Sequence, residues 1–233
     1  MKTLIMDTAT NFLIVGLIDN KKEAIVTRIG KNDNAAYLVN KIDEVLKNNN
    51  TTIDEIDEII VGIGPGSYTG IRVSVVVAKT LAYSKGIKLK QISSIALLTS
   101  GYNFLVYGAI DARRNHYFAG KYLEGKEIVK DSYINKEVLE QLSNVIILNE
   151  ETIKLNLNKI SENARLVEDT FSLEPNYLRK TEAERNYDKI NEKRWYFWSW
   201  KTWKKSIKRN FRSKFFWSRI KLKPFRLLLC LWA

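Results

Sequence analysis

Apolar and polar positions in the first third of the chain follow strand and helix periods in turn. Three short apolar or alternating runs are separated by turn residues, which is typical of strands joined by tight connections. Apolar residues at helical spacing then follow Asn34, which we expect to cap a helix that ends at 48–50. The runs predict three strands, at 4–6, 12–18 and 23–29.

The remaining pattern predicts a second, similar set of elements. A strand at 59–63 leads through a glycine-rich turn into a helix from about Gly70 to Ser84, which Gly86 closes. Further strands are expected at 104–110, 116–123 and 145–148, with a helix near 136–143. The pattern alone supports an α/β fold. We divide the chain into a first lobe (1–103), a second lobe (104–188) and a tail (189–233).

The helix expected at 70–84 is apolar nearly all round. One broad stripe runs from Ile71 to Ala82, whereas Val73, Val76 and Tyr83 fall on the opposite side, where a surface helix is normally polar. Two interpretations stay open. The helix is either buried on both sides in the chain's own core, or its second face is covered by a partner chain.

The glycine-rich turn at 62–70 is the most distinctive local motif. It matches neither a Walker loop nor G-x-G-x-x-G. Its glycines fit either tight packing or the close approach of an anion to a helix start, and we expect Gly66 at positive φ. Arg72 is a candidate for an anion or a partner carboxylate. The candidates for an anion loop are Asp7, Thr8, Gly64, Gly66, Ser67, Thr69, Gly70 and Arg72.

Four ordered motifs resemble those of one family. They are GPGSYTGIR at 64–72, MKTLIMDTAT at 1–10, AIDARRNHY at 109–117 and EPNYLR at 174–179. Together they resemble the TsaB family, also called YeaZ, from Met1 to about Arg185. The resemblance implies an actin-like (ASKHA) fold of two duplicated ribonuclease-H-like lobes.

The resemblance also implies a function. TsaB is the non-catalytic subunit of the bacterial complex that places N6-threonylcarbamoyl on the adenosine beside the tRNA anticodon. This chain is accordingly expected to be a cytoplasmic scaffold that binds and activates the related subunit TsaD. TsaE is expected in the full complex, and tRNA is expected to bind through that complex. No membrane partner is expected. Whether it also forms homodimers stays open. The candidate interface residues are Val73, Val76, Tyr83, Leu38 and Ile42.

The chain offers little for catalysis. TsaD carries a His-x-x-x-His metal pair in its first helix, whereas here that helix contains no histidine, and His116 is the only one in the chain. His116 is expected to be a surface or packing residue. Ala9 stands where an actin-like phosphate turn has glycine, so Asp7 is expected to cap its turn. We therefore expect no catalytic residue, metal or cofactor, and at most weak nucleotide binding. The alternatives are an actin-like kinase or ATPase and, third, an M22-type peptidase relative.

The last 45 residues differ from the rest. They hold all six tryptophans, the single cysteine, 14 lysines and arginines and one acidic residue, so the net charge of +12 comes from them. Three interpretations compete: an RNA-binding arm, a membrane-surface segment, or a frameshift near residue 190. We favour the frameshift. A frame one base later turns each UGG tryptophan codon into glycine, and Trp195–Trp203 would then contain G-x-G-x-x-G.

Overall fold

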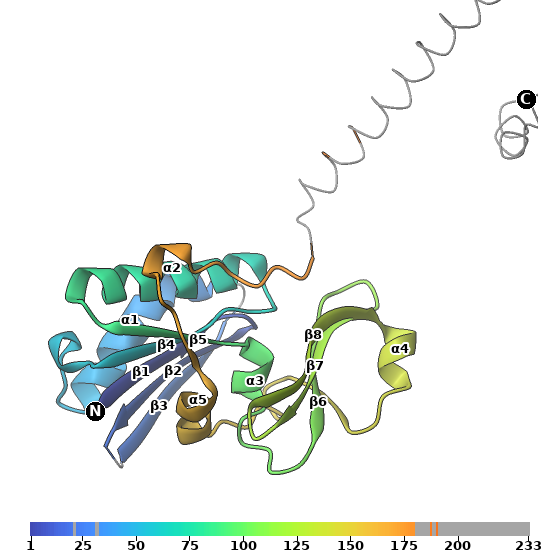
Figure 1. Cartoon of the computed structure of the whole chain (residues 1–233), viewed down its shortest axis with the longest axis horizontal. Helices are drawn as coiled ribbons and strands as arrows, with labels where there is room; N and C mark the ends of the chain where they lie inside the picture. Colours follow the sequence, from blue (N-terminus) through green and yellow to red (C-terminus); the bar gives the residue numbers. More distant parts are fainter. Residues whose placement is uncertain (21, 31–32, 180–186, 188–189, 191–233) are drawn as a thin grey trace, which may run out of the picture. The chain divides into compact units, whose positions relative to one another are not determined.

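The computed structural model describes residues 1–20, 22–30, 33–179, 187 and 190 (Figure 1). The interpretations of the tail beyond residue 190 lie outside the described residues. The chain divides into a unit of residues 1–179 and a second unit from 180 onward, and the description below concerns the first unit.

The first sheet has six strands in the order β10-β5-β4-β1-β2-β3. β1 to β3 form an antiparallel meander, and β4 and β5 add in parallel on the other side of β1. The short β10 then pairs antiparallel with β5, so the chain returns to the first sheet after completing the second. The strands are β1 (Lys2–Asp7), β2 (Phe12–Asp19), β3 (Lys22–Ile29), β4 (Glu58–Gly62), β5 (Lys88–Ile92) and β10 (Arg165–Leu166).

Helices cover both faces of this sheet. On β1, Leu4 and Met6 point toward α1 (Asn34–Asn48) and α2 (Tyr68–Lys85), because they share a buried cluster with those helices. Ile5, between them in sequence, packs on the opposite face with α3 (Ser94–Leu98) and α5 (Leu157–Asn163). Because successive side chains of a strand point to opposite faces of the sheet, β1 contributes residues to two separate cores. Figure 1 shows α1 and α2 together on one side of the sheet and α5 on the other.

The second sheet repeats the plan of the first. Its order is β8-β7-β6-β9, with three antiparallel strands followed by a fourth that is parallel to β6. Both lobes thus run strand, strand, strand, helix, strand in the same spatial order. This repetition confirms the duplicated, actin-like α/β fold expected from the sequence. The elements are β6 (Val106–Asp111), β7 (His116–Leu123), β8 (Lys126–Asn135), α4 (Lys136–Glu140) and β9 (Val145–Ile147).

A buried polar network ties the start of α3 to the second sheet. The Ser93 hydroxyl caps α3 and donates to Asp131 Oδ2 at 2.6 Å, and the Tyr122 hydroxyl donates to Asp131 Oδ1 at 2.5 Å. Burial raises the pKa of Asp131 above its usual range. This contact was not predicted from the sequence, because Ser93 lies 29 residues from Tyr122 and 38 from Asp131.

Several predicted boundaries change. Asn34 is the first residue of α1 and not its cap; its side-chain amide donates to the carbonyls of Thr10 and Asn11, while Asp33 takes the cap position. α2 begins at Tyr68, two residues earlier than expected, and Gly86 closes it at φ 66° as predicted. The elements β5, α3, β8, α5 and β10 were not predicted. The division at residues 103 and 188 stays a prediction.

Two single-turn 3-10 helices complete the described chain, at Ile53–Glu55 and Thr170–Ser172. Within the described residues, none of the helices combines the length and apolar character that a membrane span requires.

Candidate functional site

The turn after β1 is closed by a buried carboxylate. Asp7 is fully buried; the Ser94 hydroxyl donates to its Oδ2, and the backbone N–H of Ala9 donates to its Oδ1 at 2.9 Å. Burial raises the pKa of Asp7 to about 6. The expectation that Asp7 caps its own turn is confirmed.

The glycine-rich loop packs directly on this turn. The Ser67 N–H donates to the Ala9 carbonyl at 2.7 Å, and the Thr8 hydroxyl donates to the Gly70 carbonyl at 2.6 Å. A β-carbon on Gly66 would lie 2.2 Å from the Ala9 carbonyl oxygen, and one on Gly70 would lie 2.0 Å from that of Thr8. The glycines therefore allow backbone to approach backbone. This geometry favours the packing interpretation of the loop.

The expected conformation of Gly66 is wrong. Among the loop glycines, Gly64 has a positive φ, at 94°, and Gly66 does not. What requires glycine at position 66 is the nearby Ala9 carbonyl, not the backbone angle.

Gly64 also lies close to Asp7, because its N–H donates at 3.0 Å to the Ser94 hydroxyl that contacts Asp7. The Ser67 side chain caps α2 by accepting from the Gly70 N–H at 3.4 Å, and Thr69 is exposed. Arg72 lies on the outer face of α2, where its Nη1 donates to the Tyr68 hydroxyl at 3.1 Å. The structure thus brings Asp7, Thr8 and the three loop glycines at 64, 66 and 70 together but leaves Arg72 on a different surface. Anion binding at the loop stays a prediction.

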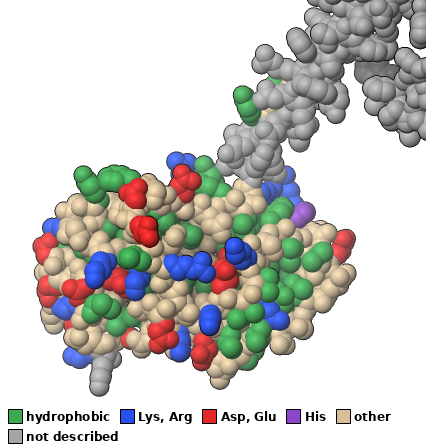
Figure 2. All heavy atoms as spheres, viewed as in Figure 1, with side chains coloured by type: hydrophobic (Ala, Val, Ile, Leu, Met, Phe, Trp, Pro, Cys, Tyr) green, Lys and Arg blue, Asp and Glu red, His purple; other side chains and the backbone are tan. Residues whose placement is uncertain are grey.

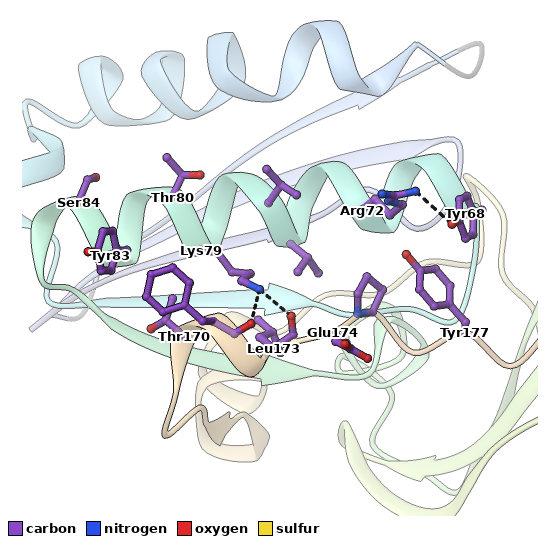
Figure 3. A pocket seen from close by; sticks show the side chains of 14 residues that line it. Tyr68, Arg72, Lys79, Thr80, Tyr83, Ser84, Thr170, Leu173, Glu174 and Tyr177 are labelled. Carbon is purple, nitrogen blue, oxygen red and sulfur yellow. Dashed lines mark hydrogen bonds between the residues drawn. The ribbon is translucent and has the colours of Figure 1, made fainter.

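That outer surface is a groove of about 630 Å³ between α2 and the segment 170–177. Figure 3 shows the side chains of both elements facing each other across it. The Lys79 ammonium anchors the segment by donating to the carbonyls of Phe171 and Leu173, at 2.8 and 3.0 Å. A lysine that contacts two carbonyl oxygens holds the backbone of the segment beside the helix.

Aromatic pairs stand at both ends of the groove. Tyr83 meets Phe171 edge-on, with ring centroids 4.8 Å apart. Tyr68 stacks on Tyr177 at the same centroid distance (Figure 3). All four rings remain substantially exposed, and Val76 between them is 59% exposed. The groove is therefore a largely apolar surface framed by aromatic rings.

The structure separates the predicted interface residues into two groups. Val76 and Tyr83 are exposed, so α2 is not buried on both sides within its own lobe. Val73 is partly buried and packs against the first core. Leu38 and Ile42 are buried in that core, and the large exposed apolar residues of α1 are instead Tyr37 and Val39.

Part of this surface was not predicted from the sequence. Tyr68, Arg72, Val76, Lys79 and Tyr83 follow one another at spacings of three or four along α2. That spacing places them on one stripe and could have been found from the sequence. Phe171 could not, because no local pattern shows which helix the segment 170–177 will contact.

His116 is partly exposed and packs on a neighbouring ring, in keeping with the expected surface or packing role. Its ring stacks on Tyr133 with centroids 4.7 Å apart, and its Nδ1 lies 2.8 Å from the Arg114 carbonyl. Within the described part of the chain, no group of three or more histidine, cysteine or acidic residues is arranged to hold a metal ion.

A protein-family model described as TsaD, tRNA N6-adenosine threonylcarbamoyltransferase, matches residues 24–163, which is more than half of the chain. A curated relative, the tRNA threonylcarbamoyladenosine biosynthesis protein TsaB of Haemophilus influenzae, is 27% identical over 159 residues. The chain belongs to this family, as a TsaB (YeaZ) member.

Further TsaB relatives support this assignment. TsaB of Bacillus subtilis is 32% identical over 127 residues. The matches cover 60% of this chain and 67% of the H. influenzae protein, and 52% of this chain and 55% of the B. subtilis protein. The chain thus matches about two thirds of one TsaB relative and about half of the other.

Solved structures of YeaZ-like proteins share the fold. A crystal structure described as an uncharacterized protein with similarity to peptidase YeaZ from Pseudomonas aeruginosa superimposes with a TM-score of 0.64 at 19% identity; it covers 76% of this chain and 99% of the other. YeaZ from Pseudomonas aeruginosa gives a TM-score of 0.53 at 25% identity and covers 57% of this chain and 66% of its own. The TsaB (YeaZ) resemblance read from the four motifs is confirmed.

Proposed function

We propose that this TsaB family member acts in tRNA threonylcarbamoyladenosine biosynthesis as a non-catalytic scaffold in the cytoplasm. The names of its TsaB relatives, which refer to tRNA threonylcarbamoyladenosine biosynthesis, support the process. The surroundings of Asp7 support the non-catalytic role, because both of its carboxylate oxygens already accept hydrogen bonds from within the lobe. A carboxylate that is fully buried and paired in this way positions a turn and lies out of reach of a substrate.

The exposed outer face of α2 carries the proposal. Val76, Tyr83 and Phe171 are 59, 67 and 64% exposed and line one groove. Covering such a surface with a partner removes apolar area from water. We propose that the partner is TsaD, the protein named in the description of the matched family model. TsaE and tRNA then join through the resulting complex.

Binding on this face gives a simple mechanism for activation. A scaffold that binds only the ordered form of its partner raises the fraction of partner in that form. Arg72 at the edge of the groove supplies a cation for a partner carboxylate, because it is exposed and its guanidinium donates to the neutral Tyr68 hydroxyl. A second copy of this chain is the competing occupant of the groove.

Val76→Glu tests the proposal. A carboxylate forced into an apolar interface loses its hydration without gaining a partner, so we expect loss of TsaD binding by at least about a hundredfold, or about 3 kcal/mol. The free protein should melt as the wild type does, because Val76 faces solvent. The measurements are a titration of purified TsaD by calorimetry and a thermal melt by circular dichroism.

Val138→Glu is the matched control. Val138 is an exposed valine on α4 of the second lobe, 44% accessible, and its replacement makes the same change in charge. It should leave TsaD binding within twofold. If Val76→Glu binds as tightly as this control, the α2 face is not the interface. Size-exclusion chromatography of both variants without TsaD shows whether self-association uses the same face.

A further inference from the structure

The turn that joins β6 to β7 has an unusual backbone. Arg113, Arg114 and Asn115 have φ values of 65°, 55° and 57°, so three consecutive residues are left-handed. The other described non-glycine residues with positive φ are asparagines and one glutamate, and no other arginine is among them. Left-handed backbone is unfavourable for residues with long side chains, whereas asparagine and glycine tolerate it.

The arginine side chains do not build this turn. The Arg113 N–H donates to Asp111 Oδ1 at 2.7 Å, the His116 N–H donates to the Arg113 carbonyl, and the Arg114 carbonyl contacts His116 Nδ1. All of these contacts use the backbone of the two arginines. Asparagine at both positions would form the same turn with less strain. A strained position whose side chain has no structural task is a candidate for function.

Positive charge is concentrated at this place. Arg113 and Arg114 are exposed, and neither forms an ion pair within the described residues. Arg179 reaches the same turn, because its Nη1 donates to the Ala112 carbonyl at 2.9 Å. The turn (Arg113–Asn115, hereafter the arginine turn) thus presents guanidinium groups that can bind an anion with two hydrogen bonds each.

A flat ring surface lies beside the arginine turn. The rings of His116 and Tyr133 are nearly parallel, at 8°, and the Arg179 guanidinium lies 5.6 Å from the centre of the Tyr133 ring. No other aromatic ring of the described chain stacks on His116. Figure 2 shows the histidine at the surface with basic side chains next to it. Such a surface can stack a planar ligand group.

We propose that the arginine turn and the His116–Tyr133 pair form a direct contact surface for RNA. Arg113 and Arg114 bind backbone phosphates, and the imidazole face stacks a nucleobase. An acidic peptide would satisfy the arginines but not the ring surface, and RNA satisfies both. The choice of tRNA as the RNA rests on the proposed function; the surface itself is separate from the α2 groove.

The double variant Arg113→Asn/Arg114→Asn tests the proposal in the full chain without TsaD. The probe is a fluorescently labelled, unmodified tRNA transcript, titrated by fluorescence anisotropy at several KCl concentrations. We expect affinity to fall about tenfold and the slope of log K against log salt to decrease in magnitude by 1 to 2. We expect the melting temperature to rise, because asparagine tolerates the left-handed backbone.

Two further variants make the result specific. Lys126→Gln/Lys130→Gln removes the same charge from exposed positions on β8, where Lys126 lies at the opposite end of the strand from Asn135, the residue paired with His116. It should change tRNA affinity less than threefold. Arg113→Lys/Arg114→Lys keeps the charge and should retain most of the affinity. The basic residues after position 188 are the same in every variant and contribute equally.

The outcomes separate the proposals. Equal affinities for the asparagine variant and the Lys126/Lys130 control would overturn the RNA surface. A lower melting temperature of the asparagine variant would overturn the claim that the arginines have no structural task. Equal loss of binding to poly-glutamate and to tRNA would show an acidic-polymer site and not an RNA site. The Val76→Glu experiment tests TsaD binding, and its result does not depend on any of these three outcomes.

Discussion

The turns after β1 and β6 occupy equivalent positions in two lobes of the same topology, and they are built in opposite ways. Asp7 and Asp111 each end the first strand of a lobe, and each accepts a backbone N–H two residues later. The first turn is buried under the glycine-rich loop, whereas the second is exposed, left-handed and rich in arginine.

The difference follows from what each turn contacts. The first is covered by the start of α2, so its residues are small and its polar atoms are paired inside the lobe. The second has no such cover among the described residues, so its side chains are free to serve a ligand. One duplicated motif has become a packing element in one lobe and a candidate binding surface in the other.

The largest effect is expected where loop and turn meet in the first lobe. Gly66→Val places a β-carbon 2.2 Å from the Ala9 carbonyl and should lower the free energy of unfolding by about 3 kcal/mol, since neither backbone can move freely. Urea denaturation measures the loss. The control Thr69→Val, at an exposed position of the same helix start, should change stability by less than about 0.5 kcal/mol. An unchanged midpoint for Gly66→Val would contradict the packing of loop on turn.

A second effect depends on pH and concerns Asp7. Its pKa is about 6 in the folded state against 3.8 when unperturbed, so between these pH values the folded protein binds more protons than the unfolded chain. Stability should therefore fall as pH rises from 4 to 6, by up to about 3 kcal/mol. Asp7→Asn cannot ionise and should remove this contribution.

The measurement is the free energy of unfolding of wild type and variant across that pH range. The difference between the two proteins isolates Asp7 from the other titrating groups. If Asp7→Asn keeps the pH dependence of the wild type, then Asp7 does not titrate as its burial implies.

The smallest expected change in stability comes from placing a glycine in each of the two turns. Arg114→Gly relieves a left-handed backbone and should raise stability by about 0.5–1 kcal/mol. Ala9→Gly, at a position without positive φ, should lower it by a similar amount, because glycine gains freedom in the unfolded chain. Thermal melts show whether each variant is more or less stable than the wild type. Changes of the same sign would show that the turns do not differ in backbone strain.

The amino-acid sequence by itself determined most of the local structure. The apolar runs of β1 and β2, the helical spacing in α1 and the end of α2 at Gly86 are properties of neighbouring residues, and all were predicted. The capping role of Asp7 was predicted for the same reason, since its partner Ala9 lies two residues away. The outward stripe on α2 was predicted in part, through Val76 and Tyr83.

Only the tertiary structure decided which distant segments meet. The Ala9 carbonyl beside Gly66, the Lys79 contacts to residues 171 and 173, and the return of β10 to the first sheet each join segments far apart in the sequence. The tertiary structure also decided that Leu38 and Ile42 are buried, because the same apolar stripe can face a core or a partner. Periodicity shows which face of an element is apolar, but the packing of the whole chain selects what covers that face.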